Sequence, residues 1–366
     1  MLTAFAIPLR ASKARRHVAL PLGAFIVVAS HAQAAQSEYR VRSLVSDGSV
    51  PAQNTDPDLV NAWGLASSPS GPWWVANNGT GTSTTYDSAG ESAPIRVDIS
   101  NGADPSPVTG MVFNGSTEFV ISDGTSSGPA TFLFASEDGT INGWANNVPP
   151  GSRETQVVVD NSGSGAIYKG LALGGSGGGL FLYAADFHNA RIDVFDSDFQ
   201  PATMEGDFTD STIPEGFAPF NIVNIQNRLY VTYAKQDAAG EDDVKGKHLG
   251  FVNVFDTEGR LIKRLIKRGR LNAPWGVAMA PGDFGQFRDM LLVGNFGDGK
   301  INAYDPDTGK WRGVLKRSPS HTIVIDGLWA LEFGNGGQGG STNSLFFTAG
   351  PQDEEGGQFG RINLRP

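Results

Sequence analysis

A polar side chain recurs at one position of a pattern that the chain repeats along its length. In four repeats this position holds Asn77, Asp123, Asp186 and Asn295, each just after a second apolar run. Carboxylate and amide oxygens are the ligands that calcium prefers in proteins. If the repeats lie around one axis, these oxygens form a ring that could bind a calcium-like divalent cation or another ligand. The default interpretation is that they cap turns by accepting backbone hydrogen bonds, which also explains why they recur.

His188 is the histidine best placed for chemistry, because it lies two residues after Asp186 in the same polar stretch. An imidazole at this point could act as a general base or as a metal ligand. Together with the four ring residues it supports a metal-dependent hydrolase or lactonase that opens a small ester or lactone at the central face. An exposed loop residue without a chemical role is the default interpretation. The chain has no cysteine, so thiolate catalysis and disulfides are excluded.

Two acidic runs fall between apolar segments, at Glu241–Asp243 and Asp353–Glu355. We expect them to be solvated loop tips, because runs of like charge repel one another and favour water. A surface calcium site is the alternative, although neither run has the ligand spacing of an EF-hand.

The repeated pattern consists of a small or polar anchor residue, an apolar run, a second run and a third run that ends in a turn rich in aspartate and glycine. Six such units occur, at intervals of about fifty residues, the length typical of a propeller blade. A small anchor lets the innermost strand pass close to a crowded axis. The six anchor positions are Gly64, Gly110, Gly170, Asn221, Gly276 and Ala330.

The sequence therefore predicts an all-β fold, a six-bladed β-propeller that occupies residues 36–366 as one domain. We expect the strand-like segment at residues 39–46 to close the last blade, the alternative being a disordered arm. Five or seven blades stay open as counts, because the segment at residues 157–160 fits either neighbouring unit.

Aromatic residues recur just before or at the anchor positions. They could form a stacking platform for a sugar or a peptide, but packing between blades is the expected role because each blade needs a bulky filler there. These residues are Trp63, Phe220, Trp275 and Trp329.

The composition limits the partners that the protein can have. The net charge of -10 makes binding to nucleic acid or to anionic lipid unfavourable, so we expect no nucleic-acid partner. We expect a monomer.

The first 35 residues predict a signal peptide. Lys13, Arg15 and Arg16 precede an apolar run at residues 18–29, which is followed by a small-x-small cleavage pattern at residues 32–34. A buried first helix is the alternative, and the export route stays open between the general and the twin-arginine pathways. No later run reaches membrane-spanning length. We therefore expect an exported protein, periplasmic or extracellular, with no transmembrane anchor after signal cleavage.

The stretch at residues 186–196 (DFHNARIDVFD) resembles the NHL repeat of propeller proteins. More of the chain is similar to an uncharacterised family of exported bacterial propeller proteins, through the segments at residues 43–47, 58–66, 73–87, 108–114 and 131–144. That resemblance implies a six-bladed propeller and no established activity. The chain is also distantly similar to gluconolactonase-type propellers, but residues 61–63 (NAW) stand where that family has its metal-binding glutamate.

The leading functional interpretation is a binding module for a protein or glycan partner, because no complete catalytic set of residues is evident. The metal-dependent hydrolase is the alternative.

Overall fold

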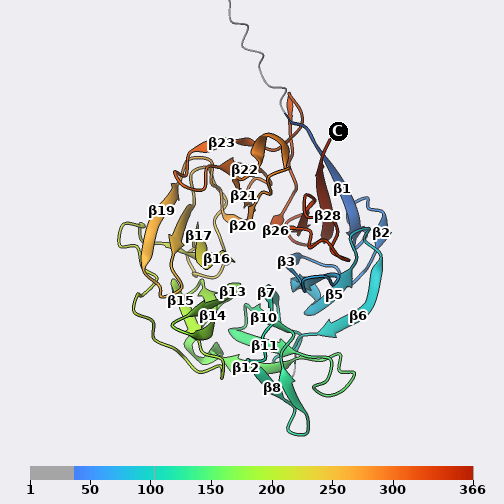
Figure 1. Cartoon of the computed structure of the whole chain (residues 1–366), viewed down its shortest axis with the longest axis vertical. Helices are drawn as coiled ribbons and strands as arrows, with labels where there is room; N and C mark the ends of the chain where they lie inside the picture. The colour runs from blue at the N-terminus through green and yellow to red at the C-terminus, as the bar shows by residue number, and fades with distance from the viewer. Residues whose placement is uncertain (1–36, 103, 366) are drawn as a thin grey trace, which may run out of the picture. The chain divides into compact units, whose positions relative to one another are not determined.

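The computed structural model describes residues 37–102 and 104–365. The predicted signal peptide lies outside these residues. The regular secondary structure of the described residues consists of strands and three short 3-10 turns at Asn78–Thr80, Ser162–Ser164 and Gly285–Phe287, joined by loops. Figure 1 shows the strands arranged as a ring of small sheets around one axis. The predicted six-bladed propeller is confirmed, with six main antiparallel sheets.

Each blade starts with its inner strand, which lies nearest the axis, and continues outward. Blade 1 contains β3 (Ala62–Ser67), β4 (Trp73–Asn77), β5 (Thr82–Tyr86) and β6 (Ser92–Asp98). Blade 2 contains β7 (Val108–Phe113), β10 (Phe132–Ser136), β11 (Thr140–Trp144) and β12 (Gln156–Asp160). Blade 3 contains β13 (Tyr168–Ser176), β14 (Gly179–Asp186) and β15 (Arg191–Phe195).

The second half of the ring follows the same plan. Blade 4 contains β16 (Phe217–Ile225), β17 (Arg228–Lys235), β18 (Phe251–Phe255) and β19 (Leu261–Lys267). Blade 5 contains β20 (Pro274–Met279), β21 (Leu291–Asn295), β22 (Ile301–Tyr304) and β23 (Trp311–Val314). Blade 6 contains β26 (Leu328–Phe333), β27 (Leu345–Ala349), β28 (Gln358–Leu364) and β1 (Tyr39–Ser46), with β2 (Asn54–Thr55) parallel to β1.

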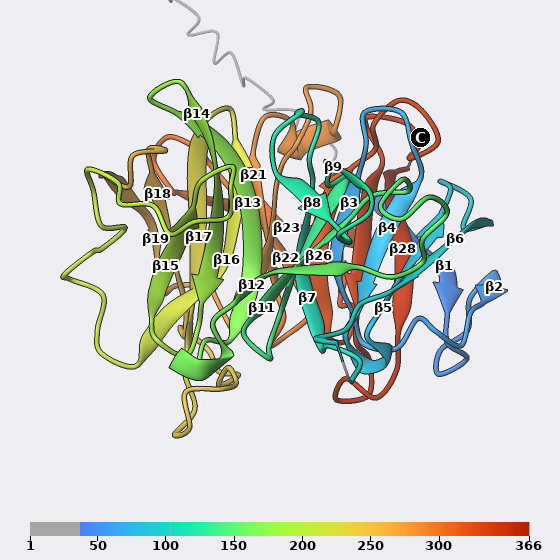
Figure 2. The ribbon, with the colours of Figure 1, turned by 90° about the horizontal axis from the view of Figure 1, so that it is seen from below.

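Two small hairpins lie outside the blades. The segment at residues 157–160, whose blade the sequence left open, is also assigned. The hairpins are β8 (Val120–Ser122) with β9 (Ser127–Pro129), drawn in teal in Figure 2, and β24 (Lys316–Ser318) with β25 (His321–Thr322). Residues 157–160 belong to β12, the outer strand of blade 2, where β12 pairs with β11. This pairing leaves six blades.

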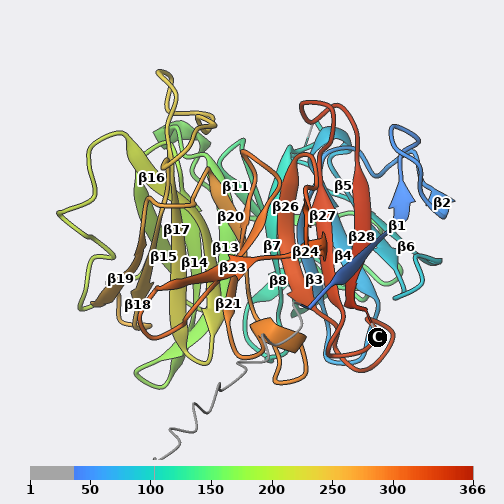
Figure 3. The same ribbon diagram turned by 90° about the horizontal axis from the view of Figure 1, so that it is seen from above.

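The ring is closed by the first strand of the described chain. β1 pairs antiparallel with β28 from Tyr39, opposite Leu364, to Ser46, opposite Gln358. Figure 3 shows β1 alongside β28 at the outer side of blade 6. The inner strand of blade 6, β26, also contacts β3 of blade 1. The predicted closure by residues 39–46 is confirmed.

At the anchor positions that hold glycine, the inner strands approach one another closely. A Cβ atom on Gly64 would lie 2.5 Å from the carbonyl oxygen of Thr109 in the next inner strand. The corresponding distance from Gly276 to the carbonyl oxygen of Trp329 is also 2.5 Å. Real side chains do not approach a backbone oxygen so closely, so these positions exclude any residue with a Cβ unless the strands move apart.

The aromatic residues at the anchor turns fill the centre of the ring. The ring centroids of Trp63 and Trp329 are 3.7 Å apart, and those of Phe296 and Trp329 are 3.9 Å apart. Trp275 and Phe220 meet Trp329 edge-on. We call these five residues the aromatic plug. All five are buried, so the expectation that these aromatic residues pack between blades is confirmed.

Candidate functional site at the hub

The axis of the propeller has two ends with different chemistry. At one end of the axis the inner strands begin and the second strands end. In blade 1, for example, Ala62 at the start of β3 pairs with Asn77 at the end of β4. We call this end the polar mouth. At the other end the inner strands stop, and we call this end the apolar mouth. The aromatic plug lies at the anchor turns, where the inner strands begin.

Three predicted ring residues occupy equivalent positions on the polar-mouth side. Asn77, Asp186 and Asn295 each end the second strand of a blade, and all three are buried. Asn77 Nδ2 donates hydrogen bonds to the hydroxyl oxygens of Thr82 and Thr84, both 3.0 Å away in its own blade. None of the hydrogen bonds found among the described residues joins one of these three side chains to another.

Asp186 and Asn295 also work within their own turns. The carboxylate of Asp186 accepts hydrogen bonds from the backbone N–H and the side-chain amide of Asn189, at 3.2 and 2.8 Å. Asn295 Nδ2 donates to the carbonyl oxygen of Arg270 and to Asp298 Oδ1, at 2.8 and 3.0 Å. Asp186 thus accepts a backbone hydrogen bond, as the turn-capping interpretation expects. The Oδ1 atoms of Asn77 and Asn295 instead lie buried without a hydrogen-bond partner among the described residues. Within the described part of the chain, no three His, Asp or Glu side chains gather as a metal site would require.

The placement of Asp123 in the ring was wrong. Asp123 lies in the turn of the extra hairpin β8–β9, where its carboxylate accepts hydrogen bonds from the backbone N–H groups of Thr125 and Ser126. The second strand of blade 2 is β10, and Ser136 holds the position equivalent to Asn77. The hairpin has the same strand-then-turn pattern as a blade, which is why the sequence did not separate the two.

His188 lies in the exposed loop that follows β14. Its backbone carbonyl accepts a hydrogen bond from Gln236 Nε2 at 3.1 Å. A Cβ atom on Gly240 would lie 3.3 Å from His188 Nδ1, so the imidazole faces the loop that joins β17 to β18. The structure thus places His188 against a blade 4 loop.

The residues that do converge at the polar mouth lie one position beyond the predicted ring. Asn78 and Glu137 follow Asn77 and Ser136, and Asn78 Nδ2 donates to Glu137 Oε2 at 2.8 Å. The other carboxylate oxygen of Glu137 contacts the ammonium of Lys169. The side chain of Lys169 is only 2% exposed, so a charged group is held inside the hub.

Lys169 has several counter-charges. Its Nζ atom lies 3.7 Å from Asp242 Oδ1 and over the ring of Trp63, 5.1 Å from the centroid. Burial acts to lower the pKa of Lys169, but the carboxylates of Glu137 and Asp242 outweigh burial and raise it. The ammonium therefore stays charged at neutral pH and pairs with the carboxylate of Glu137.

The expectation that both acidic runs are solvated was wrong for two of their members. Glu354 Oε2 accepts a hydrogen bond from Asn61 Nδ2 at 2.9 Å, close to the axis. Asp243 Oδ2 is buried without a hydrogen-bond partner among the described residues, and burial raises the pKa of Asp243 to about 7. Both runs are delivered by long loops of different blades, and such contacts between distant segments leave no local pattern in a sequence.

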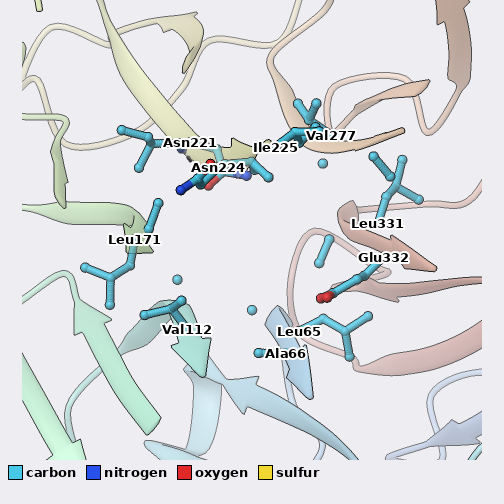
Figure 4. Close-up of a pocket in the computed structure, with 18 of the residues that line it drawn as sticks. Leu65, Ala66, Val112, Leu171, Asn221, Asn224, Ile225, Val277, Leu331 and Glu332 are labelled. Atoms are coloured by element: carbon cyan, nitrogen blue, oxygen red, sulfur yellow. Dashed lines mark hydrogen bonds between the residues drawn. The ribbon is translucent and has the colours of Figure 1, made fainter. Parts of the chain in front are cut away.

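The apolar mouth contains a cavity of about 760 Å³. Figure 4 shows its walls, to which every inner strand contributes. The apolar side chains that share this lining include Leu65, Val112, Leu171, Ile222, Val277 and Leu331.

Glu332, in β26, is the charged residue of this cavity. Figure 4 shows its carboxylate pointing into the open space. No hydrogen bond or ion pair to it occurs within the described residues. The nearby amide of Asn224 is already engaged, because Asn224 Nδ2 donates to the carbonyl oxygen of Leu173 at 2.7 Å. Glu332 is partly buried, and this partial loss of hydration raises the pKa of its carboxyl group to about 8.

Lys169 and Glu332 were both missed by the sequence reasoning, although a signal for them exists. They are the only charged residues in the six inner strands as the structure bounds them. A charge in a strand that is otherwise apolar or small on both faces needs a partner or a function. Counting charges in the inner runs would have identified one residue at each mouth.

Among residues 37–102 and 104–365, no helix has the length and apolarity needed to cross a bilayer.

Comparisons with known proteins agree with the fold and provide relatives. No family model matches the chain. The staphylococcal virginiamycin B lyase superimposes with a TM-score of 0.52 at 12% identity, over 90% of this chain and 89% of that one. A streptogramin B lyase structure gives a TM-score of 0.51 at 12% identity, over 90% of this chain and 98% of that one. At this level of identity the likeness shows the fold alone.

Two sequence relatives come from Acanthamoeba polyphaga mimivirus. The uncharacterized protein R648 is 34% identical over 339 residues, which is 90% of this chain and 81% of the relative. The uncharacterized protein L690 is 34% identical over 305 residues, which is 81% of this chain and 79% of the relative. These relatives are viral, so a bacterial and exported family stays a prediction. The chain belongs to the same family as R648 and L690 and has the fold of a six-bladed β-propeller.

Proposed function

We propose that the protein is a binding module whose ligand site is the cavity at the apolar mouth. The ligand is a mostly apolar molecule, or a side chain of a protein partner, that carries a protonated amine. The observation that supports this proposal is the carboxylate of Glu332, which faces an apolar cavity of about 760 Å³ without a partner among the described residues.

The size and lining of the cavity fit such a ligand. Small-molecule sites typically measure roughly 300–1,000 Å³ and combine apolar walls with a few polar groups that orient the ligand. The lining also contains polar side chains, among them Asn224, Gln226 and Asn227, which could orient the polar part of a ligand. Of the protein and glycan partners that the sequence suggested, we propose the protein, because a basic side chain would meet the carboxylate of Glu332.

The raised pKa of Glu332 makes binding depend on pH. With a pKa of about 8 the carboxyl group is mostly protonated at neutral pH when the cavity is empty. A cationic ligand binds the ionised form, so binding releases a proton. We expect the affinity for an amine to rise by about tenfold per pH unit between pH 6 and pH 8.

The proposal is tested with three probes of one shape: adamantylamine, adamantanol and adamantanecarboxylate. Isothermal titration calorimetry of the protein should show that the amine binds at least about tenfold more tightly than the alcohol at pH 8, and that the carboxylate binds more weakly than either. Glu332→Gln is the matched variant, because it keeps the shape of the side chain and removes the charge. It should abolish the preference for the amine and leave the affinity for the alcohol unchanged.

Three results would overturn the proposal. They are the absence of binding by all three probes, equal affinities for amine and alcohol in the unmodified protein, and a preference for the amine that survives Glu332→Gln. A preference that decreases above pH 8 would show instead that the protonated carboxyl group acts as a hydrogen-bond donor.

Export to the periplasm or the extracellular space is also a proposal, supported by the charge and hydropathy pattern of residues 1–35. N-terminal sequencing of the secreted product should give a chain that starts near residue 35. Hydrolysis of an ester or lactone with a calcium-like cation held by Asn77, Asp186 and Asn295 stays a prediction, and no specific contact in the structure favours it.

A further inference from the structure

Blade 3 differs from the other blades in its outer part. Its sheet has three strands, β13, β14 and β15, whereas every other main sheet of the described chain has at least four. In Figure 2, β15 lies at the outer side of β14. The edge that a fourth strand covers elsewhere is therefore covered only in part at β15.

The chain begins a fourth strand after β15 and then leaves. Phe195 bridges to Pro201, and the N–H of Ala202 donates to the carbonyl oxygen of Val194 at 2.8 Å. A few residues later the chain binds to blade 4. The N–H of Gly206 donates to the carbonyl oxygen of Glu258 at 2.7 Å.

A cavity of about 680 Å³ lies between β15 and the departing segment at residues 201–208. Because the carbonyl group of Val194 points outward to Ala202, the backbone groups of Ile192, two residues earlier, point to the same side. No partner for them occurs among the described residues. Ile192 therefore presents an unpaired N–H and C=O to the cavity, which is how a sheet edge accepts another strand.

The charges around this cavity leave one carboxylate without a cation. Arg191 pairs with Asp193 at 2.6 Å, and Glu205 pairs with Arg260. Asp207 is exposed, and among the described residues its carboxylate accepts hydrogen bonds from its neighbour Thr209 and has no cationic partner. These hydrogen bonds lower the pKa of Asp207, so it is ionised at neutral pH.

We propose that blade 3 binds an extended segment of a partner protein as its fourth strand. The segment alternates apolar and basic residues, so that its backbone pairs with Ile192, an apolar side chain packs near Phe208 and a basic one meets Asp207. Strand addition of this kind gains affinity from main-chain hydrogen bonds and specificity from alternate side chains. This site is independent of the cavity that contains Glu332.

The test uses fluorescent peptides of alternating lysine and valine, read by fluorescence anisotropy. The Lys-Val peptide should bind, whereas a Glu-Val peptide should not. A Lys-Val peptide that is N-methylated at alternate residues should lose binding in one methylation register and keep it in the other, because only one edge of the peptide pairs with β15. Ile192→Pro, which removes the outward N–H, should also abolish binding.

Charge variants test whether the Lys-Val peptide binds at this site or is attracted only by the overall negative charge of the protein. Asp207→Lys should weaken binding of the Lys-Val peptide by at least about tenfold. Asp198→Lys is the matched control, because Asp198 is equally an exposed aspartate after β15 but does not line the cavity, and it should have little effect. Absence of binding, equal losses for the two variants, or equal binding of both methylated peptides would overturn the proposal. The methylated peptides give this answer even if Ile192→Pro does not fold.

Discussion

The ammonium of Lys169 contacts the carboxylate of Glu137, lies 3.7 Å from Asp242 and packs over the ring of Trp63. Glu332, at the other end of the axis, has no such partners among the described residues. A buried ion that is paired within the chain contributes to a fixed structure, whereas an unpaired one is available to a ligand. The two charged residues of the inner strands are thus expected to respond differently to substitution.

Lys169→Met should strongly destabilise the protein. The variant leaves Glu137 without its cation. Breaking a buried pair costs about 3–5 kcal/mol, and the 24% exposure of the Glu137 side chain places this variant at the lower end of that range. Urea denaturation measures the change in the free energy of unfolding. Lys245→Met is the control, because Lys245 pairs with Asp353 at 3.6 Å and Asp353 is 99% exposed. The control should cost less than about 1 kcal/mol. Equal losses in the two variants would contradict this prediction.

Glu332→Gln should change how stability depends on pH. The pKa of Glu332 rises from an ordinary value of 4.5 to about 8 on folding, so between these values the folded protein holds more protons than the unfolded chain. The contribution of Glu332 to the free energy of unfolding is therefore complete below about pH 4.5 and is lost as the pH rises through about 8.

Glutamine does not titrate, so the variant should match the unmodified protein at pH 4.5 and exceed its free energy of unfolding by at least about 1 kcal/mol at pH 9. Thermal or urea denaturation across this range measures the difference. A constant difference between the two proteins at all pH values would show that Glu332 is not withdrawn from water.

At the scale of the element, the side chains that an inner strand can carry are limited by the inner strands of the adjacent blades. Gly276→Ala should cost about 3 kcal/mol, because its Cβ atom would lie 2.5 Å from the carbonyl oxygen of Trp329 and force two blades apart. Gly163→Ala is the control, since a Cβ atom there meets no atom within 4 Å. The control should stay within about 0.5 kcal/mol of the unmodified protein. Thermal denaturation compares the two, and a tolerated Gly276→Ala would mean that the inner strands are less crowded than described.

The elements that the sequence predicted well are those with a local pattern. Runs of alternating or continuous apolar residues, turns that end in glycine and the small anchors all repeat within each blade, so six copies reinforce one assignment. Asp123 was misplaced because the β8–β9 hairpin carries the same local pattern without belonging to the sheet. Asp243 and Glu354 were misjudged because only the folding of two long loops over the axis brings them to Lys169, and that depends on contacts between distant residues.

At the scale of the whole molecule, the two ends of the axis differ in their side chains and lie one inner-strand length apart. One end of the axis is closed by the aromatic plug and a network of paired charges. The other end is an apolar cavity with one carboxylate. A third possible contact surface lies at the outer edge of blade 3. The cavity that contains Glu332 and the cavity beside β15 share no lining residue. A change at one of these two proposed sites should therefore leave binding at the other intact.

The pairing of β1 with β28 also governs when this polypeptide can finish folding. The ribosome makes β1 more than three hundred residues before its partner at Gln358–Leu364. A nascent chain can form single blades, but it holds an unfilled place in its last sheet until translation is almost over. The ring of the growing polypeptide therefore cannot close until synthesis is almost complete.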